Sequence, residues 1–169
     1  EIGNRLGLHK STVHRILAAM GERGYIEKLA DTGRYKIGIK LVELSSARLN
    51  SVELKTEARG YLWQLTSKLN ATTHLAILDG TDAIYIDKVD VVNNIRLYSQ
   101  IGLRIPVYCS ALGKSLLSGL SDEELENIVS KCSFKRFTGR TITNKEELIK
   151  QVRAVRSKGW SVDDEEHDE

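Results

Sequence analysis

The sequence predicts an α+β protein with three parts: an N-terminal winged helix-turn-helix, a linker helix and a second domain whose sheet is largely antiparallel. Apolar residues recur at helical spacing in the first 20 positions, and the period changes to alternation between positions 25 and 37. Strand and helix patterns are then mixed through the rest of the chain. With 169 residues, 41% of them hydrophobic, the chain can form a small domain and a larger one.

The helix-turn-helix is predicted by residues 1–20. Ile2 and Leu6 stand four positions apart, and Gly7 interrupts the pattern. The stretch STVHRILAAM, residues 11–20, follows as a second helix, and its apolar face consists of Val13, Ile16, Leu17 and Met20. A short helix, a tight turn containing glycine and a second helix with a polar outer face are typical of a helix-turn-helix.

A β-hairpin, the wing, is predicted directly after the second helix. Residues 25–28 and 34–37 both suit strands, and the turn-forming residues Asp31, Thr32 and Gly33 lie between them. A hairpin in this position completes the winged form of the helix-turn-helix.

The basic charge of the chain is concentrated in this first segment. Residues 1–40 hold eight Lys or Arg and four Asp or Glu, out of totals of 25 and 23, which leaves 17 basic and 19 acidic side chains in the remainder. The asymmetry indicates a polyanionic partner for the first segment, and the alternative is an ordinary solvated surface.

We expect this partner to be double-stranded DNA. Free backbone N–H groups and the dipole at the start of the second helix favour phosphate. One turn later, side chains can reach base edges in the major groove, and the hairpin can meet phosphate or the minor groove. The residues expected in these roles are, in that order, Lys10, Ser11 and Thr12, then His14 and Arg15, and finally Lys28 and Arg34. The alternative is a helix-and-hairpin packing unit that binds no ligand.

The rest of the chain predicts a linker helix and a mixed domain. Residues 39–50 lack Pro and internal Gly and predict a helix, and residues 52–69 predict an amphipathic helix packed on a sheet. Strands over 73–79 and 83–89, joined by a turn at Gly80 and Thr81, predict an antiparallel hairpin. The remaining expected elements are a strand over 94–101, helices over 110–119, 121–131 and 144–158, with a capping box of Ser121 and Glu124, and a strand over 161–165.

Both halves of the chain resemble the IclR family of bacterial transcriptional regulators. In the first half the resemblance lies in GLHKSTVHRILAAMGERGYIEK and TGRYKIGIKLVEL. In the second half it lies in AIYIDKVDVVNNIRLYSQIGLRIPVYCSALGKSLLS, FTGRTIT and GWSVDDEEHDE. The resemblance implies a GAF-like effector-binding domain after the winged helix-turn-helix, and the chain is expected to be incomplete at both ends.

The resemblance also implies domain bounds and a function. The expected parts are the DNA-binding domain (1–38), the linker helix (39–51) and the effector-binding domain (52–169). The implied function is a ligand-responsive transcriptional regulator, expected to repress catabolic genes as a homodimer or dimer of dimers, and to be neither an enzyme nor dependent on a cofactor. In pattern it looks most similar to regulators that respond to sugar acids of the ketodeoxygluconate type.

The expected effector is a small carboxylate or sugar acid. Pro106 fixes the entry to a loop, and the small residues that follow open a helix whose N–H groups an anion can approach. By their place in the family motif, the pocket residues are expected to be Asn94, Leu97, Ser110, Ala111, Leu112 and Asp163. The alternative is that Ser110 only caps this helix and Gly113 only permits close packing.

Other chemistry is disfavoured by the pattern. The acidic run 163–166 suggests a divalent metal, but neighbouring residues of a strand point to opposite faces, so no metal site is expected. His74 and His167 are isolated and fit core or surface positions. Cys109 has no histidine near it in a recognisable nucleophile pattern and is expected to be a small buried or pocket-lining residue.

Two alternative functions remain open on sequence grounds. The first is an enzyme with Ser110 or Cys109 as nucleophile, supported by His167 and Asp163, although the G-x-S-x-G elbow is absent. The second is an interaction scaffold in which the helices over 39–69 form a dimer seam. The enzyme alternative leaves the basic helix-turn-helix unexplained, and the scaffold predicts dimerisation without salt-sensitive DNA binding.

The sequence also suggests a cellular location. It shows no signal-peptide pattern and no apolar stretch of membrane-spanning length. The two cysteines lack C-x-x-C spacing, so neither a disulfide framework nor a zinc site is expected. We therefore expect a cytoplasmic protein without a membrane partner.

Overall fold

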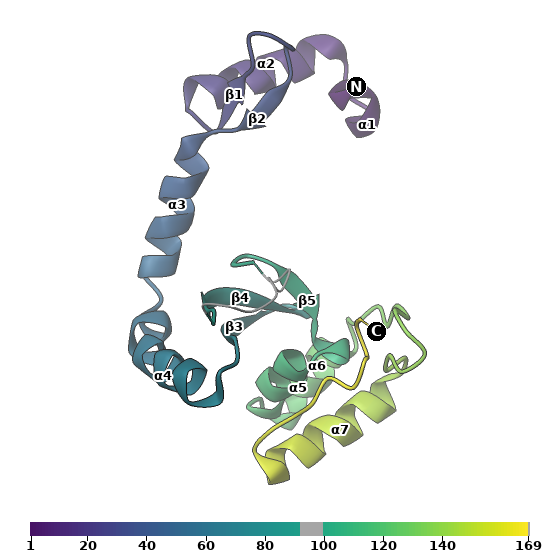
Figure 1. The fold of residues 1–169 in the computed structure, drawn as a ribbon. Coiled ribbons are helices and arrows are strands. Elements are labelled where there is room, and N and C mark those ends of the chain that lie inside the picture. The colour runs from purple at the N-terminus through teal and green to yellow at the C-terminus, as the bar shows by residue number, and fades with distance from the viewer. Residues whose placement is uncertain (92–99, 169) are drawn as a thin grey trace. The chain divides into compact units, whose positions relative to one another are not determined.

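The computed structural model describes residues 1–91 and 100–168, and it divides into two compact units, Glu1–Thr56 and Glu57–Glu169 (Figure 1). The two units together contain helices and antiparallel sheets. The predicted α+β class is therefore confirmed. Among the described residues, no helix is both long and apolar enough to cross a membrane.

The first unit contains the predicted helix-turn-helix. Helix α1 (Ile2–Leu6) and helix α2 (Lys10–Glu22) are joined by a turn in which Gly7 adopts φ 63°. Because a side chain is strained in this left-handed conformation, glycine is the residue that the turn requires. The backbone N–H of Leu8 closes the turn on the carbonyl of Gly3 at 3.0 Å.

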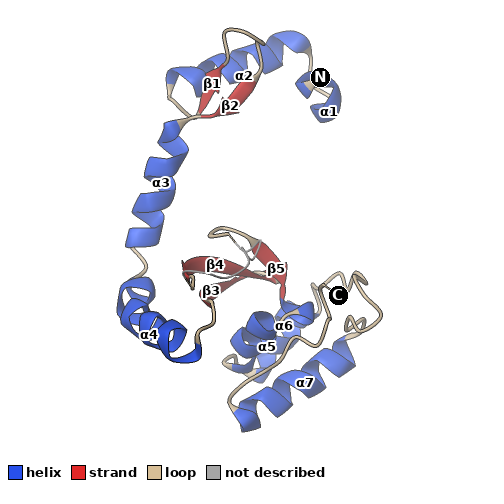
Figure 2. Ribbon diagram, in the orientation of Figure 1, coloured by secondary structure: helices blue, strands red, loops and turns tan. Residues whose placement is uncertain are grey.

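The wing is a short antiparallel hairpin of β1 (Ile26–Lys28) and β2 (Tyr35–Ile37), drawn in red in Figure 2. Its register pairs Ile26 with Ile37 and Lys28 with Tyr35. Helix α3 (Ile39–Asn50) begins two residues after the hairpin, as the sequence predicts.

The second unit is built on a three-stranded antiparallel sheet in the order β3–β4–β5. Strands β3 (Thr73–Asp79) and β4 (Asp82–Val89) form the predicted hairpin around a turn in which Gly80 has φ 62°. Strand β5 (Arg104–Pro106) pairs with the start of β4 and was not predicted. It is only three residues long, too short for a clear alternating pattern.

Helices cover one part of this sheet and carry the core. A 3₁₀ turn (Val107–Cys109) leads into α5 (Ala111–Ser118), which contacts both the sheet and α7 (Lys145–Lys158), and α6 (Asp122–Val129) also packs on α7 (Figure 1). The core consists of Val107, Tyr108, Cys109, Leu117, Leu125, Val129, Ile142, Leu148 and Val152. The predicted capping box of Ser121 and Glu124 is present at the start of α6.

Helix α4 (Glu53–Leu69) is present, but its buried face is narrower than the sequence suggests. Only Leu62 and Thr66 are buried, and the hydroxyls of Thr66 and Thr73 lie 2.7 Å apart. Tyr61 and Leu65 are among the apolar residues at helical spacing that predict this amphipathic helix, and they are nevertheless exposed. The hydrophobic pattern predicted the helix correctly. However, fewer of its apolar side chains are buried by the described residues than the pattern suggests.

The strand predicted over 161–165 is wrong, because this segment is a loop. Its backbone is held by side chains and not by a neighbouring strand: Thr138 donates to the carbonyl of Glu165 and Thr141 donates to the carbonyl of Glu166. Side-chain donors therefore satisfy carbonyls that a strand would direct to a ladder. Most of the strand predicted over 94–101 lies outside the described residues, and positions 100 and 101 are not in a strand.

Candidate DNA-binding and effector-binding sites

The start of α2 presents a polar surface. Lys10 is the first residue of the helix, and His9 caps it by accepting a hydrogen bond from the backbone N–H of Ser11 at 3.4 Å. Ser11, His14 and Arg15 are exposed. The histidine cap was not predicted, because histidine is uncommon at a position that Ser, Thr, Asp and Asn dominate. Thr12, also expected at the interface, is half-buried.

Seven of the eight cations in residues 1–40 fall into two groups. Three of them are paired with carboxylates: Arg5 with Glu1, Lys36 with Glu27 and Lys40 with Glu43. The four cations expected to contact DNA, which are Lys10, Arg15, Lys28 and Arg34, form no ion pair with any residue in the described part of the chain. The first unit therefore carries positive charge that its own acids do not compensate.

Two of these cations share one groove. A groove of about 630 Å³ lies between α1, α2 and the wing, and both Lys10 and Arg34 line it. The start of the second helix and the tip of the hairpin are thus neighbours in the fold although they are 24 positions apart. The structure brings together the helix start and the wing, the two elements from which the sequence analysis expected phosphate contacts.

In the second unit, Ser110 is a helix cap. Its hydroxyl oxygen accepts from the backbone N–H of Gly113 at 3.1 Å, its hydroxyl donates to the carbonyl of Pro106 at 3.2 Å, and the residue is 4% exposed. Ala111 and Leu112 are half-buried at the start of α5. Asn94 and Leu97, the other residues expected on this side of the pocket, lie outside the described residues.

Gly113 permits a close approach between α5 and the preceding 3₁₀ turn. A Cβ atom at this position would lie 2.3 Å from the Cα atom of Val107 and 2.4 Å from its carbonyl oxygen. These are backbone atoms, so a side chain cannot be accommodated by a rotamer change. These contacts of Ser110 and Gly113 are the ones expected if Ser110 caps the helix and Gly113 permits close packing.

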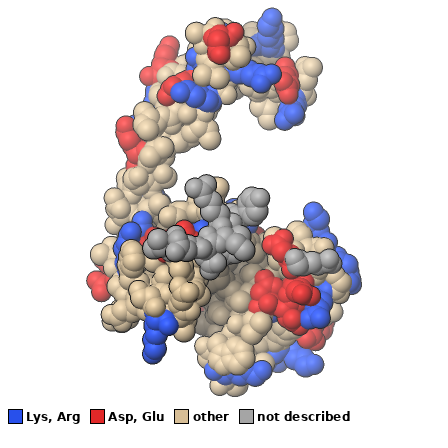
Figure 3. Space-filling model, in the orientation of Figure 1, with Lys and Arg blue, Asp and Glu red and all other residues tan. Residues whose placement is uncertain are grey.

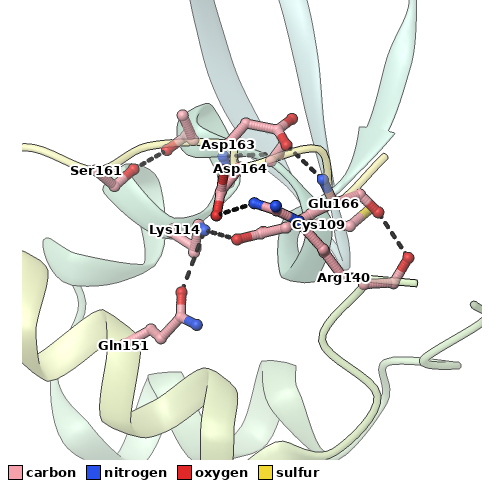
Figure 4. A network of polar contacts seen from close by, with 12 residues as sticks. Cys109, Lys114, Arg140, Gln151, Ser161, Asp163, Asp164 and Glu166 are labelled. Atoms are coloured by element: carbon pink, nitrogen blue, oxygen red, sulfur yellow. Dashed lines mark hydrogen bonds and ion pairs between the residues drawn. The ribbon is translucent and has the colours of Figure 1, made fainter. Parts of the chain in front are cut away.

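The carboxylates of the acidic run have protein partners (Figure 4). Asp163 accepts from the backbone N–H of Glu166 at 2.9 Å, and Asp164 lies 2.6 Å from Arg140, which also approaches Glu165 at 3.6 Å. Acidic and basic side chains gather on the second unit where this segment lies (Figure 3). No group of three or more His, Cys, Asp or Glu suited to a metal occurs among residues 1–91 and 100–168.

The last residue of this run, Glu166, belongs to a buried ion pair that the sequence did not predict. The ammonium of Lys114 lies 2.6 Å from Oε1 of Glu166 and 3.2 Å from Oε1 of Gln151, with side-chain exposures of 3% for Lys114 and 6% for Glu166 (Figure 4). Burial raises the pKa of the Glu166 carboxyl, because desolvation outweighs the attraction of Lys114. The sequence did contain a signal for this pair: Lys114 stands three positions before Leu117, on the apolar face of α5, where a lysine needs a partner.

The described residues offer no activated nucleophile for the enzyme alternative. Cys109 is fully buried, and burial raises the pKa of its thiol to about 12, so the thiolate that a nucleophile requires does not form near neutral pH. His167 lies beside the ring of Phe137, with centroids 4.7 Å apart, and contacts Asp168 at 2.8 Å. Within the described residues, no hydrogen bond joins His167 to Cys109 or Ser110.

Comparisons with known proteins cover the whole chain. Residues 46–169 match the family described as "Bacterial transcriptional regulator IclR C-terminal", and residues 1–30 match "IclR helix-turn-helix domain". The chain is 34% identical to the HTH-type transcriptional regulator XynR of Escherichia coli K12 and 38% identical to KdgR of Dickeya chrysanthemi, in both cases over all of its length. It spans 67% of the first relative and 55% of the second.

A solved structure agrees in fold. The crystal structure of the Thermotoga maritima IclR matches with a TM-score of 0.74 and 29% identity, covering 99% of this chain and 67% of that one. The helix-turn-helix match and the C-terminal match follow each other in the order that the sequence analysis expected. The chain belongs to the IclR family of bacterial transcriptional regulators.

Proposed function

We propose that this chain is part of a ligand-responsive transcriptional regulator that binds operator DNA and represses catabolic genes. Family membership supports this proposal, as do relatives whose names describe HTH-type regulators. The observation that carries the DNA-binding part is the set of uncompensated cations on α2 and the wing, because a polyanion attracts cations that lack carboxylate partners. An enzymatic role has no such support.

In this proposal α2 is the recognition helix. Lys10, Ser11 and Thr12 meet phosphate at its start, His14 and Arg15 read base edges, and the wing adds contacts from Lys28 and Arg34. Phosphate contacts set the position on the duplex and base contacts provide specificity. The affinity should therefore fall steeply as salt rises, with a slope of log K against log salt near −0.9 for each phosphate contact.

Replacing Arg15 with alanine separates the two kinds of contact. If Arg15 reads a base, Arg15→Ala should weaken operator binding by about 1–3 kcal/mol and relax the preference at one base position. Fluorescence anisotropy against an operator selected from a random duplex library, and against its single-base variants, measures both effects. Equal weakening on every sequence would assign Arg15 to phosphate and contradict its role in base reading.

Lys28→Ala is the matched control on the wing. It should weaken binding uniformly across sequences and reduce the salt slope by about 1. Lys36→Ala, which removes a cation already paired with Glu27 at 2.8 Å, should have a smaller effect on the slope. A protein whose affinity for duplex DNA did not depend on salt would contradict the DNA-binding proposal as a whole.

The effector proposed for the second domain is a small carboxylate or sugar acid. The proposed site is the loop at the start of α5, with Ala111 and Leu112 beside the capping Ser110, and it includes Asp163, Asn94 and Leu97. The sugar-acid part of this proposal rests on the sequence pattern alone, and the relatives XynR and KdgR support the regulator part, since both are described as HTH-type transcriptional regulators. Among the site residues that the structure describes, Asp163 is exposed and the start of α5 is half-buried. This exposure supports access by a ligand.

Asp163→Ala tests this site. It should reduce the rise in melting temperature that a carboxylate effector produces, because a ligand stabilises the native state according to its affinity. A thermal-shift panel of sugar acids, keto acids and aromatic acids first identifies the effector. Operator affinity without ligand should stay nearly unchanged, and a variant that lost operator affinity while keeping its ligand response would remove Asp163 from the proposed site.

The proposed organisation is a DNA-binding domain over 1–38, a linker helix over 39–51 and an effector-binding domain over 52–169. A homodimer or dimer of dimers would present two recognition helices to the half-sites of an operator. Exposed apolar residues on α3, among them Ile39, Val42 and Leu44, support a protein interface there. The effector would act by binding the two states of the assembly with different affinity. We also propose a cytoplasmic location, because operator DNA is found there.

A further inference from the structure

The second unit contains a cavity that the proposed function does not use. It has a volume of about 360 Å³, lies between α5, α7 and the segment 158–166, and is lined in part by Lys114, Lys158, Trp160 and Glu166. None of the described residues proposed for the effector site, which are Ser110, Ala111, Leu112 and Asp163, lines it. The volume falls within the range of about 300–1,000 Å³ that small-molecule pockets occupy.

We propose that this cavity is a second small-molecule site, and that it binds a small carboxylate whose charged end accepts a hydrogen bond from Lys114. The first argument is the hydrogen bonding of that lysine, which is 2% exposed. An ammonium has three donors. Two of them are used by Glu166 and Gln151, and the third has no acceptor among the described residues.

The partner of Lys114 is also incompletely bonded. Oε1 of Glu166 lies 2.6 Å from the ammonium, and Oε2 is buried without a hydrogen-bond partner in the described part of the chain. A buried ion pair is stable when its remaining protons and lone pairs are satisfied. Buried groups without partners in native proteins are places where water, an ion or a ligand completes the contacts. A carboxylate on the third N–H would complete the donor set of Lys114, and Oε2 of Glu166, which is an acceptor, would need a donor such as a hydroxyl of the same ligand.

The ion pairs around the cavity leave one lysine available to an anion. Of the two acids that line it, Asp164 is paired with Arg140 and Glu166 with Lys114. Lys158 has no carboxylate partner among the described residues, and its ammonium lies 5.7 Å from the centroid of the Trp160 ring. The cation available to the charged end of a ligand is therefore a lysine that lies beside an aromatic face.

Trp160 indicates the chemistry of the uncharged part of the ligand. The residue lines the cavity and is 59% exposed, so its indole offers an apolar face to the body of a bound molecule. An indole face suits aromatic or aliphatic carbon, while Lys158 and Lys114 suit the charged end. The chemical class that fits is a small organic carboxylate with a body large enough to reach the indole.

Tryptophan fluorescence provides the test. The chain has two tryptophans, and Trp63 is exposed on α4, so the full chain with Trp63→Phe has Trp160 as its sole tryptophan. Titration with benzoate, gluconate and acetate should give a saturable change in Trp160 fluorescence for at least one of the three. The absence of a saturable change with all three would overturn the proposal.

Variants separate this site from other binding. Ala154 lines the cavity, so Ala154→Phe should block it, and Lys114→Met combined with Glu166→Leu should remove the ammonium while keeping the interior apolar. Each should weaken the apparent affinity about tenfold or more, as expected for loss of the site or of a charge-assisted hydrogen bond.

A further variant serves as the control. Lys150→Met lies on α7, the helix of Ala154, with its side chain 81% exposed and outside the cavity, and should leave the titration unchanged. Equal binding by the Ala154→Phe variant, or loss of the signal in Lys150→Met, would assign the signal to another site and overturn the proposal.

Discussion

Glu166→Leu should reduce the free energy of unfolding of the second unit by about 3–5 kcal/mol, because it leaves the buried ammonium of Lys114 without its carboxylate. Lys114→Met combined with Glu166→Leu should be close to the parent protein or more stable, since an apolar pair of similar volume replaces two desolvated charges. Urea denaturation followed by Trp160 fluorescence in a Trp63→Phe background measures both. The difference between the single and double variants isolates the penalty of the unpaired charge.

The Lys114→Met variant adds a pH dependence. Its remaining carboxyl, Glu166, can become neutral by binding a proton, and burial already raises the pKa of this group. A carboxyl whose pKa is raised in the folded state favours folding when it is protonated, so the variant should lose stability as pH rises through the folded-state pKa. Glu166→Leu has no such group and should not show this trend.

Arg140→Ala is the matched control for this pair. Arg140 also holds the C-terminal segment through Asp164 and Glu165, but its side chain is 58% exposed. Solvent screening limits such surface pairs, so the change should stay below about 1 kcal/mol. If Glu166→Leu cost no more than Arg140→Ala, the Lys114–Glu166 pair would not be buried in solution.

Gly113→Ala should destabilise the second unit by about 3 kcal/mol or more. The added Cβ would lie 2.3 Å from the Cα atom of Val107, and because this is a backbone atom of a core residue, no change of side-chain rotamer can relieve the clash. Gly60→Ala is the control, since a Cβ at Gly60 meets nothing within 4 Å on helix α4. There alanine should stabilise by about 0.5–1 kcal/mol. Equal effects of the two changes in urea denaturation would contradict the close approach.

Local features of the fold were predictable because neighbouring residues determine them. The capping box needs only Ser121 and Glu124, three positions apart, and the glycine turn needs only the φ that Gly7 adopts. The hairpin of β3 and β4 follows from two alternating runs and the turn between them. Helix bounds were reproduced to within one residue for α5, α7 and the linker helix α3.

The candidate sites also have features that the sequence predicts and features that it does not. The polar surface of α2 was predictable, because the positions of Lys10 and Arg15 on a helix follow from its period. The uncompensated charge of that surface was not predictable, because it depends on which acids the fold brings near each cation. Asp163 was expected in a strand, and it instead accepts a backbone hydrogen bond within a loop.

By itself the sequence determined the fold class, the order of the helices and hairpins, and the family to which the chain belongs. These depend on periodicity, turn residues and motif order, all of which are local. Only the tertiary structure decided that Lys114 and Glu166 meet across 52 positions, that Gly113 touches Val107, and that 161–165 is a loop. Such contacts depend on long-range packing, in which buried charges and backbone groups find partners that no local pattern specifies.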